Sequence, residues 1–313
     1  MGIVTTTSGR SRMHETPSEA GFHRCWYPVC LSRDLAADAP HGRDFLGTRI
    51  VAWRDPAGRP VVQAAYCPHL GADLSVGRLV DGRLRCPYHH WSFDGSGACV
   101  HIPSGDKIPS TASIFAYPAA EAWGIVWAFN GEAPDYGLPR LPGATESSIS
   151  CEAFERPKAP FDTWVAVSNG VDFQHLRTVH GLPVESMPDR LAIDPAGIEF
   201  EIESPFHRQH GRITGTNVFA QHLRLGGRDL YMLFSGTPLE PGWSSGHFVV
   251  GVPKGEEARL PEVRQMAERL SAEDAPVLRS IRFRRGLLTA SDRHLASYFR
   301  YVDSFPTFVP PQG

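Results

Sequence analysis

The sequence predicts an α+β fold in two parts, a small all-β unit followed by a larger unit in which helices pack against an antiparallel sheet. Short apolar strands separated by turn residues run from Gly47 to about Glu132. Beyond Phe161, longer strands are framed by two segments of helical character. A chain of 313 residues is long enough to form two hydrophobic cores.

The first unit is predicted from its turns. Asp81-Gly82 is a two-residue hairpin signal, and the segments 55–59 and 95–97 are rich in Gly, Pro and Asp. The strands expected between these turns are Thr48–Arg54, Pro60–Cys67, Arg78–Val80, Arg83–Cys86, Trp91–Asp94, Ala98–Ile102 and Trp123–Asn130.

The second unit follows a Pro-rich stretch, Pro134–Pro142, that is typical of a linker. We therefore expect a tail at residues 1–20, a first domain at 21–134 and a second at 135–313. Two helices are expected, Phe161–Val179 and Pro261–Leu288, the second with one apolar face formed by Leu260, Val263, Met266, Ala267 and Leu270. The expected strands are Glu199–Ser204, Ile213–Leu225, Leu230–Thr237 and Gly246–Val252, with a hairpin turn at Gly226-Gly227.

Composition excludes several classes of protein. The net charge is -3 and the basic residues are scattered, so we expect no nucleic-acid partner. No apolar run reaches the roughly 20 residues that span a bilayer, and the first twenty residues are polar and lack a secretory core, which favours a disordered tail. Six cysteines without an export signal argue against a disulfide framework, so we expect a cytoplasmic protein without membrane partners.

Two pairs of Cys and His carry the first chemical signal. Cys67-Pro-His69 is followed, after sixteen intervening residues, by Cys86-Pro-Tyr-His89, and each pair lies at the end of a predicted strand. Two Cys on one iron and two His on the other is the ligand set of a Rieske [2Fe–2S] cluster. A zinc site is the alternative, but zinc fingers usually place both Cys before both His.

The segment CPHLGADLSVGRLVDGRLRCPYHHWSFDGSGACVHIP resembles the Rieske family along its whole length. The resemblance implies a [2Fe–2S] cluster held by Cys67, His69, Cys86 and His89. Neither loop has the additional cysteine of respiratory-chain Rieske proteins, so the loops resemble the oxygenase and ferredoxin branch. His90 stands where the family commonly has Gly. We expect it to face outward, with an influence on the cluster potential through hydrogen bonding.

A second motif lies beyond the point where a Rieske ferredoxin would end. The stretch from Asn169 to His180 reads NGVDFQHLRTVH and resembles the Asn-x-x-Asp-x-x-His-x-x-x-x-His motif of Rieske oxygenase catalytic domains. Fe(II) that activates O₂ is held by two His and one carboxylate, and His175 and His180 would supply the nitrogens. Two residues five positions apart on an ideal helix lie roughly 140° apart around its axis. His175 and His180 can therefore face one metal only if the helix unwinds or ends near Thr178-Val179.

The carboxylate ligand must come from elsewhere in the chain. Glu273, Asp274 and Asp292 compete for this position. The segment Ala272–Ile281 resembles the family segment in which an Asp ligand opens the long C-terminal helix, and this match favours Asp274. Without the resemblance, each of the three would be taken as a solvated surface acid.

Asp172 and Asn169 are the expected catalytic residues that are not ligands. In the family, the Asp matching Asp172 bridges the Rieske His of a neighbouring subunit to an iron-ligand His. A hydrogen-bonded carboxylate would couple His89 to His175 and fix both tautomers. The alternative is an ordinary aspartate on a helix surface. Asn169 lies one turn earlier and is expected at the border of the iron pocket.

The resemblance implies the terminal component of a Rieske non-haem iron oxygenase with a helix-grip-like second domain. Such a protein activates O₂ at mononuclear Fe(II) to hydroxylate or oxidatively demethylate a small, ring-containing substrate. It would act as a head-to-tail homotrimer supplied by a separate NAD(P)H reductase, with or without a ferredoxin. The alternatives are a cis-dihydroxylating dioxygenase and an electron-transfer or ligand-sensing protein that oxidises nothing. The strands Thr216–Leu225 and Leu230–Phe234 should line the pocket. Phe219, Tyr231 and Leu233 are candidates, with core packing as the favoured alternative for any one of them.

Overall fold

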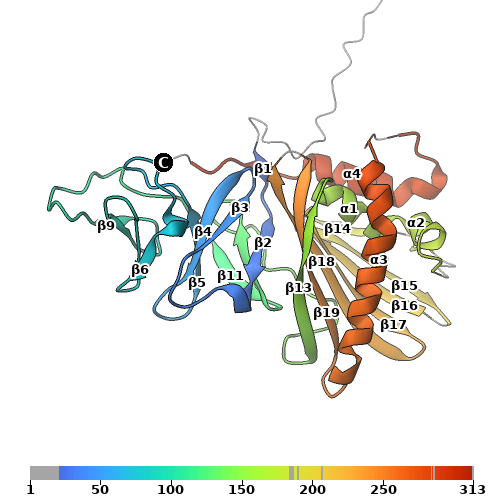
Figure 1. The fold of residues 1–313 in the computed structure, drawn as a ribbon. Helices are drawn as coiled ribbons and strands as arrows, with labels where there is room; N and C mark the ends of the chain where they lie inside the picture. Colours follow the sequence, from blue (N-terminus) through green and yellow to red (C-terminus); the bar gives the residue numbers. More distant parts are fainter. Residues whose placement is uncertain are drawn as a thin grey trace, which may run out of the picture.

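A computed structural model gives the fold of the chain (Figure 1). The expected tail at residues 1–20 lies outside the described residues. The structure describes residues 21–182, 187–188, 190–205, 207–240, 242–282, 284 and 286–311. Within these ranges, no helix is both long enough and apolar enough to cross a bilayer.

The first unit consists of three small antiparallel sheets, and the strands predicted between Thr48 and Phe129 are confirmed within one to three residues. Four further strands were not predicted, at Trp26–Leu31, His41–Phe45, Ala116–Tyr117 and Ala119–Ala122. The first sheet has the strand order β10 (Ala116–Tyr117), β5 (Pro60–Ala64), β4 (Thr48–Arg54) and β3 (His41–Phe45). The second has the order β11 (Ala119–Ala122), β12 (Ile125–Phe129) and β2 (Trp26–Leu31). The third has the order β6 (Arg78–Val80), β7 (Arg83–Arg85), β8 (Ser92–Phe93) and β9 (Cys99–His101). Short 3₁₀ turns lie at Ser32–Asp34 and Leu74–Val76.

The second unit is built on a seven-stranded antiparallel sheet. Its order is β13 (Ile149–Ala159), β19 (Trp243–Pro253), β18 (Arg228–Glu240), β17 (Val218–Leu225), β16 (His207–Thr214), β15 (Gly197–Ser204) and β14 (Ala192–Asp194). The prediction of a single strand over Ile213–Leu225 was wrong. Gly215 adopts φ +58°, and the Asn217 side chain donates to Trp26 O at 2.9 Å, so the chain turns there between β16 and β17. The hairpin at Gly226-Gly227 is confirmed.

The helices differ from the prediction at two points. The helix expected over Phe161–Val179 is broken into α1 (Thr163–Ser168), a 3₁₀ turn (Asn169–Val171) and α2 (Phe173–Thr178), because Asp172 has non-helical backbone angles and caps α2. The helix expected to reach Leu288 ends earlier, as α3 (Leu260–Ser280), where Ile281 becomes extended. Leu287 and Leu288, which the prediction placed in this helix, are exposed instead.

The remaining elements close the second unit. A helix that was not predicted, α4 (Arg293–Ser304), follows a 3₁₀ turn at Ala290–Asp292, and another 3₁₀ turn at Glu257–Arg259 precedes α3. The chain ends with β20 (Thr307–Phe308), which pairs with β1 (Phe22–His23) and so ties the C-terminal segment to the first unit.

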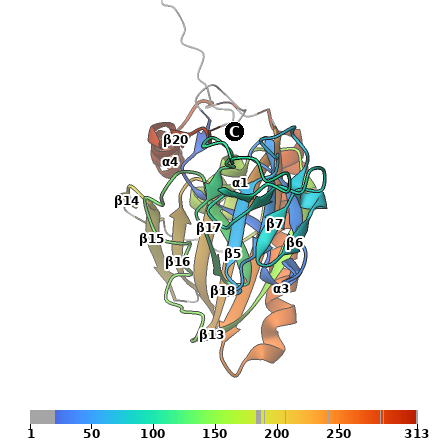
Figure 2. The same ribbon diagram turned by 90° about the vertical axis from the view of Figure 1, so that its left-hand side faces the viewer.

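The two faces of the large sheet bury different partners, because side chains alternate along each strand. One face packs under α3, where Val263 and Ala267 contact Met232 and Val250. On the other face, Val218, Ala220, Leu233 and Val249 share a core with Trp127 of β12. Figure 1 shows the β6–β9 sheet at one end of the molecule and α2 at the other, and Figure 2 views the molecule from the end that carries β6 and β7.

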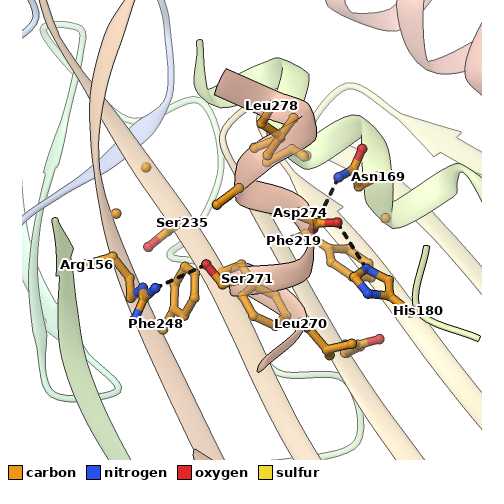
Figure 3. A pocket seen from close by; sticks show the side chains of 18 of the residues that line it. Arg156, Asn169, His180, Phe219, Ser235, Phe248, Leu270, Ser271, Asp274 and Leu278 are labelled. Carbon is orange, nitrogen blue, oxygen red and sulfur yellow. Dashed lines mark hydrogen bonds and ion pairs between the residues drawn. The ribbon is translucent and has the colours of Figure 1, made fainter. Parts of the chain in front are cut away.

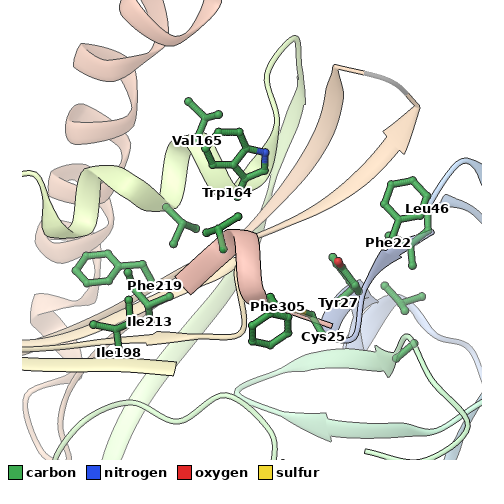
Figure 4. Close-up of a cluster of buried hydrophobic side chains, with 14 of the residues drawn as sticks. Phe22, Cys25, Tyr27, Leu46, Trp164, Val165, Ile198, Ile213, Phe219 and Phe305 are labelled. Carbon is green, nitrogen blue, oxygen red and sulfur yellow. The ribbon is translucent and has the colours of Figure 1, made fainter. Parts of the chain in front are cut away.

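A third core joins the two units near the chain ends. Trp164 of α1, Phe219 of β17 and Phe305 belong to the same buried cluster as Tyr27 and Phe45 (Figure 4). The segment Pro134–Pro142 contains no helix or strand, as expected, but it is anchored by the indole N–H groups of Trp26 and Trp123, which donate to Tyr136 O and Pro139 O. The boundary at residue 134 stays a prediction.

Two candidate metal centres

The first candidate centre lies at the tips of two loops. Cys67 and Cys86 are each 2% exposed and point into the small core around Leu74 and Phe93. His69 and His89 are exposed, and their ring centroids lie 4.5 Å apart. Backbone hydrogen bonds shape both loops, from Cys67 N to Ala72 O and from Cys86 N to Trp91 O. Two buried thiols and two exposed imidazoles therefore meet at one end of the molecule.

The chemistry of these four side chains fits a cluster with unlike irons. Burial raises the pKa of the Cys67 thiol to about 12, so its thiolate form requires a compensating cation nearby. The His69 ring is stacked on Trp91 at 4.6 Å, which holds the imidazole plane at the surface. The donor set thus accommodates one iron toward the core and one toward the solvent.

His90 occupies an unusual backbone position beside this centre. Its φ is +58°, in the left-handed region that favours glycine, and the side chain is exposed. The prediction that His90 faces outward is confirmed, while its influence on the cluster potential stays a prediction.

The second candidate centre brings together His175, His180 and Asp274, whose ligand atoms all lie within 4.8 Å of one another. The two Nε2 atoms are 3.0 Å apart, and Asp274 Oδ1 lies 3.0 Å from that of His175 and 3.2 Å from that of His180. Helix α2 ends at Thr178, as the spacing of the histidines required, and this end lets the His180 ring turn back toward His175.

Asp274 reaches the histidines from the C-terminal third of α3. The expectation that this aspartate opens the long helix was wrong, because α3 already begins at Leu260 with Pro261 in its first turn. Asp292 is not part of the group. Its carboxylate accepts hydrogen bonds from Thr289 in a capping box. Glu273 instead contacts the outer side of His180, with Oε2 2.7 Å from Nδ1.

The geometry around Asp274 fits a cation at the centre of the group. Its Oδ1 is a buried oxygen that has no hydrogen-bond partner among the described residues, although two imidazole nitrogens lie close to it. Such close contact without hydrogen-bond alignment is expected where three donors converge on a metal. The other carboxylate oxygen accepts from Asn169 Nδ2 at 3.3 Å, so Asn169 lies at this centre as expected.

Asp172 lies directly before the histidines. Its Oδ1 accepts from the backbone N–H of His175 at 2.9 Å, and the side chain is half-buried. Asp172 caps α2, and His89 lies between β7 and β8. Figure 1 shows the β6–β9 sheet and α2 at opposite ends of the molecule, so the structure does not bring these two residues together within the chain.

A cavity of about 330 Å³ opens beside His175, His180 and Asp274, between α3 and the sheet (Figure 3). Phe219 lines it, as expected, together with Leu223 and Phe234. Tyr231 and Leu233 do not line it. They lie on the opposite face of the sheet and pack with the Trp127 core, which confirms core packing, the expected alternative, for these two residues.

Sequence reasoning missed the polar residues of the cavity. Gln209 and Gln221 are buried in its wall, and Gln209 Nε2 donates to Gln221 Oε1 at 2.8 Å. His207 and Arg156 also line the cavity, although neither was assigned a role. The two glutamines within otherwise apolar strands were the available signal. They indicate a polar patch in the cavity only once it is known which face of the sheet each side chain occupies.

Comparison with known proteins found relatives of both units. Residues 25–112 match the Rieske [2Fe-2S] domain. The chain is 35% identical over 180 residues to aminopyrrolnitrin oxygenase PrnD of Pseudomonas fluorescens, covering 54% of this chain and 49% of that protein. It is 32% identical over 186 residues to the 3-chlorobenzoate-3,4-dioxygenase oxygenase subunit of Comamonas testosteroni, covering 56% of this chain and 42% of that protein.

A solved structure extends the likeness to the second unit. The NdmA QL mutant of Pseudomonas putida CBB5 with theobromine superposes with a TM-score of 0.77 at 18% identity, covering 89% of each chain. At this identity, the likeness concerns the fold alone. The chain spans about half the length, or less, of the curated relatives it matches.

The matched domain and the relatives agree with the ligand sets found at the two centres. The chain carries a Rieske [2Fe–2S] domain followed by an α+β domain of the kind found in Rieske oxygenase structures. It is related to the terminal components of Rieske non-haem iron oxygenases. A Rieske domain implies a [2Fe–2S] cluster, and the oxygenase family carries a mononuclear iron at its catalytic site.

Proposed function

We propose that the chain is the terminal oxygenase that hydroxylates or oxidatively demethylates a small, ring-containing organic substrate with O₂. The observation that carries the proposal is the convergence of His175, His180 and Asp274 at the wall of an apolar cavity, in a chain that also has a Rieske domain. A cis-dihydroxylating outcome is the alternative within the same chemistry, and the relatives include both an oxygenase and a dioxygenase subunit.

The cluster would be held by Cys67 and Cys86 on its buried iron and by His69 and His89 on its exposed iron. The arrangement supports electron entry and exit at the surface, because the imidazoles face solvent while the thiols face the core. Leu70 and Tyr88, which are 65% and 63% exposed, surround the imidazoles with apolar surface on which another protein could dock.

The mononuclear iron would be held by the Nε2 atoms of His175 and His180 and by the Asp274 carboxylate. When bound, a ferrous ion in such a site supplies activation of O₂ with electrons received from the cluster. Glu273 would fix the His180 tautomer by accepting its Nδ1–H, and Asn169 would orient the Asp274 carboxylate. The apolar cavity would hold the substrate against this group and exclude water.

Electron transfer between the two centres would occur across subunits in a head-to-tail homotrimer. The exposed His89 and the half-buried Asp172 lie at opposite ends of the chain, so a neighbouring copy would have to bring them together. One Asp172 oxygen is held by the His175 backbone, and no other hydrogen bond of this carboxylate occurs among the described residues. Asp172 would then accept from His89 of the neighbour and couple it to His175.

A separate NAD(P)H reductase, with or without a ferredoxin, would supply the electrons. We also propose a cytoplasmic location, since the six cysteines, which all lie within the described residues, form no disulfide and the cytoplasm keeps thiols reduced.

Metal analysis of protein purified without oxygen tests the proposal. The oxygenase should hold about three iron atoms per chain, two in the cluster and one ferrous ion. His180→Ala should lose the ferrous ion and roughly 10³-fold or more of the turnover, while the visible spectrum of the cluster is unchanged. His222→Ala is the matched control. His222 Nε2 lies 2.8 Å from Asp229 Oδ1, and His222 does not line the cavity.

The main rival is an electron carrier that binds a ligand without oxidising it. Such a protein would hold about two iron atoms per chain, and His180→Ala would leave its iron content unchanged. That pair of results would overturn the proposal.

A further inference from the structure

Arg156 introduces a positive charge into the cavity wall at some distance from the three metal-binding side chains. It lies near the end of β13, opposite Gly246 of β19, at the point where the pairing register of the two strands shifts. Figure 3 shows its guanidinium on one side of the cavity, with Phe248 and Ser271 beside it, and His180 and Asp274 on the other side. The side chain is half-buried.

A glycine makes room for this side chain. Gly246 of β19 lies opposite Arg156 and lines the cavity. A Cβ at Gly246 would come within 3.3 Å of Arg156 Cβ, so the arginine stem lies directly over this glycine. The absence of a side chain at this position therefore leaves space for the Arg156 stem.

The charge of Arg156 has no carboxylate partner among the described residues. Its Nη2 lies 3.5 Å from Ser271 Oγ, a long and weak contact, and its guanidinium carbon lies 5.7 Å from the Phe248 ring centroid. Nearby arginines are paired differently, since Arg43 binds Glu155 and Arg264 binds both Glu152 and Glu268. A guanidinium partly removed from water and left without an anion is a favourable site for one, because charge-assisted bidentate pairs are the strong ones.

The other cavity residues do not neutralise the charge of Arg156. Arg269 pairs weakly with Glu273 at 3.6 Å, and Arg279 is exposed at the rim. Gln209 and Gln221 satisfy each other, and the rest of the wall is mostly apolar. The cavity therefore offers a mostly apolar space with the Arg156 cation on one side and the His175, His180 and Asp274 group on the other.

From this arrangement we infer that the substrate is an organic anion, an apolar ring compound whose carboxylate pairs with Arg156. The ring would lie between Phe219 and Leu270, and the carbon to be oxidised would be the end of the molecule remote from the acid group. The inference rests on the proposed function for the identity of this cavity as the substrate site. It adds a substrate class and an orientation.

Binding of matched acids and amides to the anaerobic holoprotein tests the inference without turnover. The probes are 2-naphthoate, 3-phenylpropanoate and indole-3-acetate, each compared with its carboxamide by isothermal titration calorimetry. At least one carboxylate should bind tenfold or more tightly than its amide, which is about 1.4 kcal/mol. Arg156→Gln should remove this preference, and Arg156→Lys should keep part of it, since lysine retains the charge but loses the bidentate geometry.

Arg279→Gln is the matched control, because it removes a cation at the rim and should leave the preference unchanged. The cluster spectrum and the melting temperature of each variant report on folding. If no carboxylate binds better than its amide, or if Arg156→Gln keeps the full preference, the inference is overturned. This readout uses neither iron stoichiometry nor O₂ consumption, so its failure is distinguishable from failure of the proposed oxygenase activity.

Discussion

The two candidate metal centres are assembled in contrasting ways. The cluster residues lie between Cys67 and His89, on two loops whose backbone hydrogen bonds are local. The residues of the second centre come from α2, from the turn after it and from α3, so that about one hundred positions separate His175 from Asp274. The first centre thus depends on local turn geometry, whereas the second depends on how α3 packs over the sheet.

Because of this difference, each centre should be able to lose its metal without affecting the other. The buried thiols belong to the small core around Phe93, whereas the second centre is supported by the Met232 and Val263 core and by the core that contains Phe173 and Leu278. Because these cores do not share residues, loss of one metal should leave the other site folded.

The largest expected effect is loss of the cluster in Cys86→Ala. The substitution removes a proposed ligand that is 2% exposed, so the visible absorption and all turnover should disappear, while ferrous ion remains at the second centre. Absorption spectra and iron analysis measure both outcomes. Cys99→Ala is the control, because Cys99 is buried in the same core without a proposed ligand role, and this variant should retain its cluster.

A cluster that survives in Cys86→Ala, or one that disappears equally in Cys99→Ala, would show that these loops do not hold it as proposed. Loss of both metals from Cys86→Ala would instead contradict the independence of the two centres.

The next effect concerns the link between the centres. Asp172→Asn should retain both metals and the N-cap of α2, since asparagine caps as well as aspartate does, but turnover should fall by at least about 100-fold. Rapid mixing of reduced protein with O₂ and substrate would measure cluster oxidation directly. Asp292→Asn is a capping control that lies outside both centres and should be nearly neutral.

Cluster oxidation in Asp172→Asn at the wild-type rate would remove the bridging role. A monomer with full activity would remove the proposed trimer as well.

The same contrast explains what the sequence could and could not predict. The cluster loops were predictable residue by residue, because Asp81-Gly82 and the Cys-His spacing are local signals. The break at Asp172 and the position of Asp274 within α3 were not, since both depend on packing between helices and the sheet. Arg156 was missed for a related reason, because its placement requires the pairing of β13 with β19 to be known.

A smaller effect is expected at the outer side of the second centre. Glu273→Gln keeps the size of the side chain but weakens its hydrogen bond to His180 Nδ1, so iron affinity should fall by about 10- to 100-fold with little loss of stability. Loss of ferrous ion to a competing chelator, followed over time, measures this change. Glu262→Gln, in the exposed first turn of α3, should lose iron at the wild-type rate.

The smallest effect is expected beside the cluster, where His90 holds a left-handed backbone. His90→Gly should raise the free energy of unfolding of the holoprotein by about 1 kcal/mol, because glycine adopts φ +58° without the steric cost of a Cβ. Thermal unfolding measures the change. His101→Gly is the control, since His101 is exposed within β9 and glycine should destabilise that strand. A decrease in stability for both variants would mean that His90 contributes a contact that outweighs its backbone strain.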